Sequence, residues 1–316
     1  MNKKKLIAGF LILLSGILWG CMGLFVRPLN AKGLTSWDIV FIRASLTTFF
    51  MAILLLVRDR SLFKIKLKDL WCFLGTGLLS IVFFNMCYFK EITIAPLSVA
   101  AILLYTAPAF VMLISAFLFK EKLTKAKVLA LLLSFVGLMF VTGVFKSTER
   151  MTLKMLLIGL GAGLGYALYS IFGRYALERG YGSYTISFYT FLFATFATAF
   201  AARPFKIAAV VGSSWKSVVL VIIFALVSTI VPYLTYTIGL KSVENGQASI
   251  IASIEPVMAS FIGILWFHEK MSLSMLVGII LVLAGIVVSN LDKSVALLLR
   301  RWFYTQSCSN KEVKKY

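Results

Sequence analysis

The chain has 316 residues, of which 60% are hydrophobic and 14% are charged, and its mean hydropathy is +0.95. Soluble domains contain about 45–50% apolar and about 25% charged residues, so this composition excludes an ordinary water-soluble protein and favours the lipid bilayer as solvent. The formal net charge of +20 does not indicate nucleic-acid binding, because the Lys and Arg residues fall in short gaps between apolar runs, as from Arg58 to Lys68, and form no basic face.

The first apolar run starts after three consecutive lysines and covers residues 6–29. It is longer than the hydrophobic region of a secretory signal peptide, and no small-residue cleavage site follows it. We therefore expect a membrane helix that is retained.

Further apolar runs recur along the whole chain. A helix needs about 20 mostly apolar residues to cross the hydrocarbon region. The runs that meet this requirement cover residues 6–29, 37–57, 70–89, 96–119, 127–145, 153–173, 183–201, 217–239, 246–267 and 273–291. A transmembrane barrel would show short alternating segments instead. The sequence predicts an all-α integral membrane protein with ten transmembrane helices.

The basic residues predict the orientation of these helices. With the N-terminus in the cytoplasm, the cytoplasmic segments carry about 21 Lys and Arg residues, against about 10 on the other side. We therefore expect both termini in the cytoplasm. Residues 292–316 form a basic cytoplasmic tail, in which residues 295–304 predict a short interfacial helix with Arg and aromatic anchors.

The most informative pattern is an internal repeat. The segment AAILLYTAPAFVMLISAFLFKEKL from Ala100 matches ASIIASIEPVMASFIGILWFHEKM from Ala248 after a shift of 148 residues. The shift aligns Pro108 with Pro256, and it also aligns a Glu-Lys pair near the end of each segment. One such match could arise by chance, but a whole pattern at one offset indicates two related halves.

Each half contains five spans, which is an odd number, so the second half must cross the membrane in the opposite orientation. We predict a first five-helix repeat at residues 1–147 and a second at residues 148–291. Inverted repeats are the architecture of many secondary transporters, whose halves rock about a site near the bilayer midplane.

With these features the chain resembles the EamA family of the drug/metabolite transporter superfamily. The resemblance covers nearly the whole chain, up to about Asn290. The resemblance rests on the Leu-Trp-Gly at residues 18–20, on the two halves, and on the matched segments Lys-Glu-Lys at 120–122 and His-Glu-Lys at 268–270. It implies a plasma-membrane carrier, often an exporter of amino acids, other metabolites or drugs. It also implies a cavity lined by the first, third, fourth, sixth, eighth and ninth helices, with the fifth and tenth at the periphery.

Glu255 is the sharpest single candidate, because it lies near the middle of the ninth span and directly precedes Pro256. A carboxylate at that depth is costly and usually faces a cavity or pairs with another group. Such a group suits proton coupling, and the proline frees nearby carbonyls for coordination. The alternative is a structural carboxylate that is hydrogen-bonded to a hydroxyl or paired with Arg43.

Arg43 lies in the second span, which begins near Asp38. The resemblance places the second helix away from the central cavity. We therefore favour a structural role for Arg43, in which its side chain extends to the membrane interface or forms a fixed ion pair within the bundle.

Pro108 and Pro256 predict kinks at corresponding positions of the fourth and ninth spans. Interrupted helices in corresponding halves are a pointer to a transporter's binding site, so we expect both prolines to act as hinges. A static bend is the alternative.

The helices implied to line the cavity also carry amphipathic side chains, which suit apolar or zwitterionic metabolites. The candidate substrate-binding residues are Trp19, Asn85, Tyr88, Tyr105, Tyr166, Tyr169, Tyr233, Tyr236, Ser253 and Glu255. Each aromatic residue taken alone is also explained by packing or by a belt at the membrane interface.

The matched pairs Glu121-Lys122 and Glu269-Lys270 are expected on opposite faces of the membrane, as interface anchors or as ion pairs near a gate. His268 stands beside the second pair, and nothing nearby completes a metal site. We expect neither a metal nor another cofactor.

Two other classes of protein compete with a transporter. A membrane enzyme would need a nucleophile–base or metal constellation, which the spans lack, and no GxxxxGK[ST] motif for ATP hydrolysis is present. A channel or non-transporting assembly partner would not need broken inverted repeats. The sequence therefore predicts a non-enzymatic secondary transporter of small organic metabolites such as amino acids or drugs, with export as the favoured direction. Transport is either driven by a gradient, such as a proton gradient, or facilitative. We expect it in the plasma membrane, as in the inner membrane of a bacterium. Its expected partners are the solute, the lipid bilayer and a second copy in a homodimer, but no nucleic acid.

Overall fold

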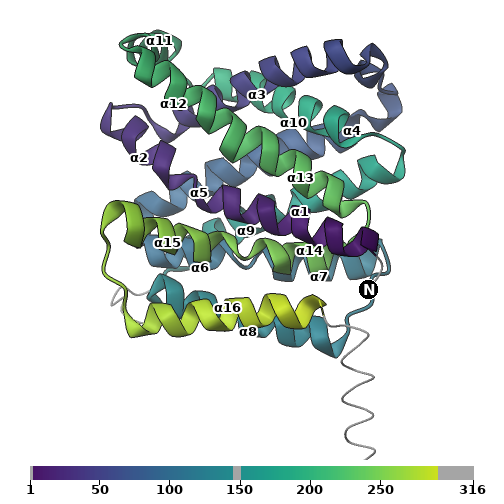
Figure 1. Cartoon of the computed structure of the whole chain (residues 1–316), viewed down its shortest axis with the longest axis vertical. Coiled ribbons are helices and arrows are strands. Elements are labelled where there is room, and N and C mark those ends of the chain that lie inside the picture. The colour runs from purple at the N-terminus through teal and green to yellow at the C-terminus, as the bar shows by residue number, and fades with distance from the viewer. Residues whose placement is uncertain (1–2, 145–150, 291–316) are drawn as a thin grey trace, which may run out of the picture.

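The protein is a bundle of long helices that run side by side, across the page in Figure 1. The computed structural model describes residues 3–144 and 151–290, and the expected interfacial helix at 295–304 lies outside this part. Within it, nine helical segments are long and apolar enough to cross a membrane, and a bent pair raises the number to ten. The prediction of an all-α, ten-helix membrane bundle is confirmed.

In the first half, several spans are built from more than one helix. The first span comprises α1 (Lys3–Gly20) and α2 (Gly23–Ala31), and the second is α3 (Ser36–Arg58). The third span comprises α4 (Leu70–Leu74), the π-helix η3 (Gly75–Val82) and α5 (Phe83–Ile94). The fourth comprises α6 (Leu97–Leu104) and α7 (Ala107–Leu118), and the fifth is α8 (Lys125–Thr142). The short 3₁₀ turns η1 (Arg60–Phe63) and η2 (Leu67–Asp69) connect α3 to α4.

The second half follows the same order. The sixth span is α9 (Leu153–Glu178), and the seventh is α10 (Ser183–Ala199) followed by α11 (Pro204–Gly212). The eighth span comprises α12 (Trp215–Ala225), the π-helix η5 (Leu226–Ile230) and α13 (Val231–Leu240). The ninth comprises α14 (Asn245–Ala252) and α15 (Glu255–Phe267), and the tenth is α16 (Leu273–Asn290). The chain bends by 110° between α10 and α11, a turn that the hydropathy pattern does not predict.

Side-chain caps define the start of four of these helices. Thr35, Thr124, Thr152 and Ser214 each accept a hydrogen bond from the backbone N–H three residues further on, at the starts of α3, α8, α9 and α12. Such a cap satisfies one of the backbone donors that an N-terminal turn leaves unpaired. The caps therefore help to set where each span begins.

The backbone itself repeats at the offset seen in the sequence. Lys120 and His268 are 148 residues apart and both adopt left-handed conformations, with φ of 55° and 54°. This conformation is uncommon for residues other than glycine. The π-helix η5 also falls, after the same shift, within η3. The two halves therefore share local geometry as well as sequence, with opposite orientation across the membrane.

The first span of each half packs tightly against the break in the other half's interrupted span. A Cβ on Gly16 would lie 2.9 Å from the carbonyl oxygen of Ala252, where α14 ends. A Cβ on Gly163 would lie 2.9 Å from the carbonyl oxygen of Leu103, close to the end of α6. These glycines let the backbones approach as small residues do in membrane helices, so packing explains their presence. The halves are thereby interlocked around the two breaks.

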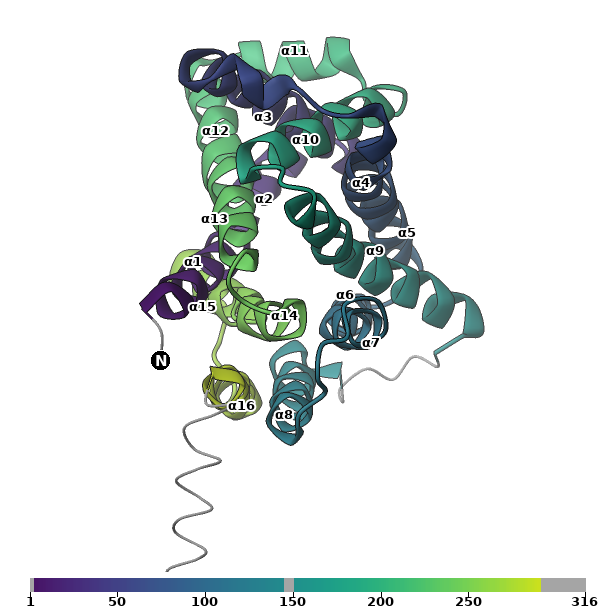
Figure 2. The same cartoon turned by 90° about the vertical axis from the view of Figure 1, so that its right-hand side faces the viewer.

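The fifth and tenth spans lie at the edge of the bundle, as the family resemblance implies. Figure 2, which looks along the helices, shows α8 and α16 side by side, apart from the ring formed by α1, α5, α9, α13 and the fourth and ninth spans. Gly137 and Gly278 meet where α8 crosses α16: a Cβ on Gly278 would lie only 2.5 Å from the Gly137 carbonyl oxygen. Small residues thus join the two peripheral helices.

We expect Gly278→Ala to destabilise the protein by about 1–3 kcal/mol, because the added methyl group has no room beside backbone atoms of α8. The measurement is thermal unfolding of the detergent-purified protein. Gly173→Ala is the matched control, since a Cβ there meets nothing within 4 Å and alanine favours a helix. Equal stability of the two variants would contradict the packing described for α8 and α16.

Candidate functional site

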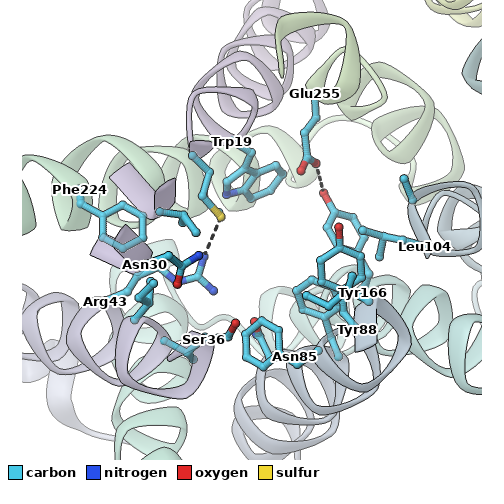
Figure 3. Close-up of a pocket in the computed structure, with 18 of the residues that line it drawn as sticks. Trp19, Asn30, Ser36, Arg43, Asn85, Tyr88, Leu104, Tyr166, Phe224 and Glu255 are labelled. Atoms are coloured by element: carbon cyan, nitrogen blue, oxygen red, sulfur yellow. Dashed lines mark hydrogen bonds between the residues drawn. The ribbon is translucent and has the colours of Figure 1, made fainter. Parts of the chain in front are cut away.

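A cavity of about 270 Å³ lies at the centre of the bundle and is lined by both halves. Its walls come from α1, α2, α3, α5 and α6 of the first half and from α9, α12, α13 and α15 of the second, with Tyr105 between α6 and α7 (Figure 3). Ligand pockets usually measure about 300–1,000 Å³, so this cavity suits a small solute.

Most of the predicted binding residues reach this cavity. The ones that line it are Trp19, Asn85, Tyr88, Tyr105, Tyr166, Tyr233 and Glu255. Tyr169, Tyr236 and Ser253 line two smaller adjoining pockets of about 20 Å³ each. Of the two prolines, Pro108 lines one of these small pockets, whereas Pro256, the second residue of α15, lines none of these three pockets.

Glu255 is the first residue of α15, at the break in the ninth span. Its Oε2 accepts a hydrogen bond of 2.9 Å from the hydroxyl of Tyr166 on α9. No Lys or Arg nitrogen of the described residues lies within 4.0 Å of its carboxylate. Of the two structural alternatives, the hydroxyl partner is therefore present and the direct ion pair with Arg43 is absent.

Arg43 does not lie where the sequence suggests. It is only 4% exposed and lines the cavity from α3, so the expected extension to the membrane interface is wrong. Asp38 is occupied by Arg203, whose Nε donates to its Oδ2 at 3.1 Å, and no carboxylate of the described residues lies within 4.0 Å of Arg43. The fixed ion pair is therefore also absent.

The second span, α3, thus lines the cavity, although the family resemblance implies that it lies away from it. Ser36, Ile39, Val40 and Arg43 follow one face of α3, and all four line the cavity. Their spacing of three and four residues places them on one side of a helix. The face they occupy is set by how α3 packs on α10 and α12, which the sequence does not reveal.

Aromatic rings form part of the wall of the cavity that Arg43 and Glu255 also line. The ring of Trp19 lies 5.1 Å from that of Tyr233 and 6.3 Å from that of Tyr166, edge to face in both pairs. The hydroxyls of Tyr169 and Tyr236, by contrast, bond within the protein, to Thr237 at 2.8 Å and to Ser170 at 2.7 Å. Packing therefore accounts for these two tyrosines more fully than for the residues that line the cavity.

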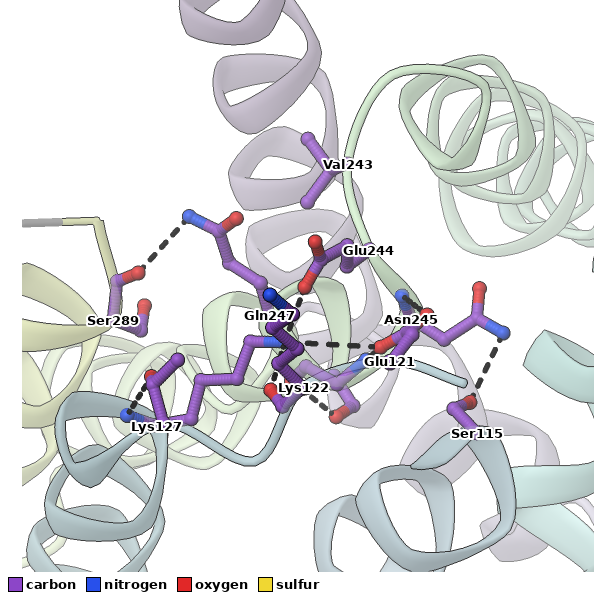
Figure 4. Close-up of polar contacts among 12 residues, drawn as sticks. Ser115, Glu121, Lys122, Lys127, Val243, Glu244, Asn245, Gln247 and Ser289 are labelled. Atoms are coloured by element: carbon purple, nitrogen blue, oxygen red, sulfur yellow. Dashed lines mark hydrogen bonds and ion pairs between the residues drawn. The ribbon is translucent and has the colours of Figure 1, made fainter. Parts of the chain in front are cut away.

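One end of the bundle, where α7 ends and α14 begins, is closed by polar contacts; we call it the Glu121 end. The carboxylate of Glu121 accepts hydrogen bonds from the backbone N–H groups of Asn245, at 2.7 Å, and Gly246, at 3.1 Å (Figure 4). A carboxylate at a helix N-terminus is stabilised by the unpaired N–H groups and the helix dipole. This contact ties the fourth span to the ninth.

Neighbouring side chains reinforce this contact. Asn245 is fully buried, and its side chain bonds to Ser115 at 3.2 Å and to the guanidinium of Arg174 at 3.0 Å. Lys127, also buried, forms an ion pair with Glu244. The Glu121 end is thus joined by residues of both halves, and Glu121 acts through backbone amides, a partner that the sequence does not show.

The opposite end, where α15 ends and α6 begins, is less firmly joined; we call it the Glu269 end. Glu269 pairs with Arg27 at 2.8 Å, and the two side chains are 45% and 54% exposed. The cavity extends from Glu255 to Asn30 and Ile92, which are exposed at this end. The cavity therefore reaches the surface at the Glu269 end.

A bundle of two inverted repeats, with a central cavity at the breaks of its interrupted helices, is the architecture of a membrane transporter. Residues 6–143 and 153–291 each match the model of the EamA-like transporter family. The chain belongs to this family, as the resemblance in its sequence predicts.

Curated relatives are similar over nearly the full chain. An uncharacterized transporter of Archaeoglobus fulgidus is 28% identical over 283 residues, covering 88% of this chain and 94% of the relative. An uncharacterized transporter of Bacillus subtilis, YxxF, is 25% identical over 288 residues, covering 90% of this chain and 89% of the relative. A solved crystal structure matches with a TM-score of 0.74 at 17% identity, covering 93% of this chain and 98% of that one, which supports the fold.

Proposed function

We propose that this protein is a secondary transporter that moves small organic metabolites, such as amino acids or drugs, across the plasma membrane by alternating access. One observation carries the proposal: both halves line a central cavity that reaches the surface at the Glu269 end, while polar contacts between the fourth and ninth spans separate it from the Glu121 end. With the N-terminus in the cytoplasm, as the basic residues predict, this is an outward-facing conformation.

The breaks in the fourth and ninth spans are the proposed moving parts. Pro108 lies in the first turn of α7 and Pro256 in the first turn of α15, just after each break. A broken helix can change the direction of its second part without losing hydrogen bonds along a continuous ladder. Rocking of the halves about these positions would close the Glu269 end and open the Glu121 end.

Glu255 is the proposed proton-coupling residue. It lies at the cavity and at the hinge of the ninth span, so its charge state can affect both solute binding and the packing of the break. In an exporter, a proton from outside would occupy the carboxylate after the solute leaves, and the solute would displace that proton on the cytoplasmic side. The proton gradient then drives net export of the solute, without a catalytic step.

The test is an untargeted comparison of external metabolites in cells that express wild type, Glu255→Gln or an empty vector. We expect at least one compound to accumulate outside with wild type alone, because the variant keeps the size of the side chain but loses its negative charge. Both proteins must be present in equal amounts in the membrane.

Other results would contradict separate parts of the proposal. Equal accumulation with wild type and Glu255→Gln would remove the coupling role and leave the transporter. If the three cultures do not differ, and inverted vesicles with an imposed proton gradient take up none of the cell's metabolites, the proposal of an exporter fails.

A further inference from the structure

Arg43 is a buried cation with no anionic partner among the described residues. The only hydrogen bond given to its guanidinium by the described residues is to the sulfur of Met22, at 3.6 Å. A thioether is a weak acceptor, and a buried charge is costly unless it is paired. Because the guanidinium lines the cavity, an anionic group of a bound solute can supply the missing partner.

Glu255 lies across the cavity from Arg43, with aromatic residues between them (Figure 3). The two groups make no direct ion pair. Trp19 and Tyr88 also line the cavity, and the Nε1 of Trp19 is a buried donor without a partner among the described residues. The cavity therefore offers a guanidinium on one side, a carboxyl group on the other and aromatic rings on its walls.

We propose that Arg43 is the anion-binding residue of the site and that, with Glu255, it selects solutes that carry both a carboxylate and an ammonium group on a small apolar frame. Arg binds carboxylates through two parallel hydrogen bonds, and an ammonium suits both a carboxylate and an aromatic face. A solute that lacks either charge leaves a buried group unpaired, which is the basis of strong discrimination. This inference rests on the proposed transport function and deepens it.

The arrangement also links binding to the proton. An ammonium group and a proton compete for the same carboxylate of Glu255, while Arg43 keeps its charge throughout. The solute and the proton would therefore occupy the site in turn, which is the exchange that proton-driven export needs.

The experiment measures binding to the full-length protein in detergent, by tryptophan fluorescence and by thermal stabilisation. The probes are the standard amino acids, each with its decarboxylated amine and its deaminated acid; phenylalanine, phenethylamine and 3-phenylpropionate form one such set. For wild type we expect at least one amino acid to bind ten times or more tightly than both of its analogues. Arg43→Gln should remove the preference over the amine, and Arg43→Lys should restore part of it.

Arg58→Gln is the matched control, since Arg58 is exposed and stacks on Tyr184 away from the cavity. The proposal is overturned if an amine binds wild type as tightly as its amino acid, if Arg43→Gln weakens all three members of a set equally, or if no amino acid binds. If the cells still export a compound with a single charge or none, the transport proposal stands and only the assignment of Arg43 fails.

A second inference follows from comparing the two ends of the bundle. The shift of 148 residues pairs Glu121 with Glu269, and it pairs Asn245 and Gly246, the start of α14, with the start of α6. The chain before each glutamate has the same form: the Glu121 N–H bonds to the Ser115 carbonyl oxygen, and the Glu269 N–H bonds to the corresponding carbonyl oxygen of Gly263.

Only one of the two equivalent contacts is made. Glu121 holds the N-terminus of α14, whereas Glu269 is held by Arg27, and Pro96, the N-cap residue of α6, provides no side-chain cap. Leu97, the first residue of α6, is 66% exposed. The acceptor and the helix N-terminus required for the second contact are thus both available at the Glu269 end.

We infer that the inward-facing conformation exchanges these contacts. Glu269 leaves Arg27 and accepts the backbone N–H groups of Leu97 and Ser98, which closes the Glu269 end, while Glu121 releases α14. Each glutamate then binds a helix N-terminus in one conformation only, so the two contacts favour opposite states.

Cross-linking tests this exchange in a variant whose four native cysteines are replaced, with new cysteines at Ser98 and His268. A short thiol cross-linker should join them in the inward-facing state. We expect Glu121→Gln to raise the cross-linked fraction at least twofold and Glu269→Gln to lower it at least twofold. Asp59→Asn is the control, since it changes an exposed carboxylate between α3 and α4. Equal changes in both glutamate variants, or none, would overturn the inference.

Discussion

The two glycine contacts between the halves position the breaks in the fourth and ninth spans, and the cavity depends on those breaks. Gly16 of α1 packs on the end of α14, and Gly163 of α9 packs close to the end of α6. A side chain at either position would meet backbone atoms at less than 3.0 Å. Each contact joins the first span of one half to the broken span of the other. The breaks are therefore held at the centre of the bundle.

The chemistry of the cavity follows from this placement. The break in the ninth span puts Glu255 at the first position of α15, within reach of Tyr166 on the neighbouring α9. The packing of α3 on α10 and α12 leaves one face of α3, with Arg43, exposed to the cavity. The contact that joins the spans at the Glu121 end uses a carboxylate on a helix N-terminus, an interaction worth up to about 2 kcal/mol where it is partly buried. A transporter can exchange such contacts during its cycle, whereas a large apolar seal would favour one state too strongly.

Much of this arrangement could be predicted from the sequence, and the remainder depends on packing. The apolar runs predict the spans, and the matched prolines predict the breaks, because both patterns are local. The depth of Glu255 follows from its position within a span. The position of Arg43 does not, since the face that α3 turns to the cavity depends on its neighbours. The bend before α11 and the capture of backbone amides by Glu121 are likewise tertiary features that residue types alone do not reveal.

Alternating access is the central claim, and accessibility from the two sides of the membrane tests it most directly. A single cysteine in place of Asn85, which lines the cavity from α5, can be labelled with a membrane-impermeant thiol reagent in right-side-out and in inverted vesicles. The account predicts labelling from both sides, with a transported solute raising the rate on one side and lowering it on the other. Labelling from one side only, or rates that rise together on both sides, would contradict it.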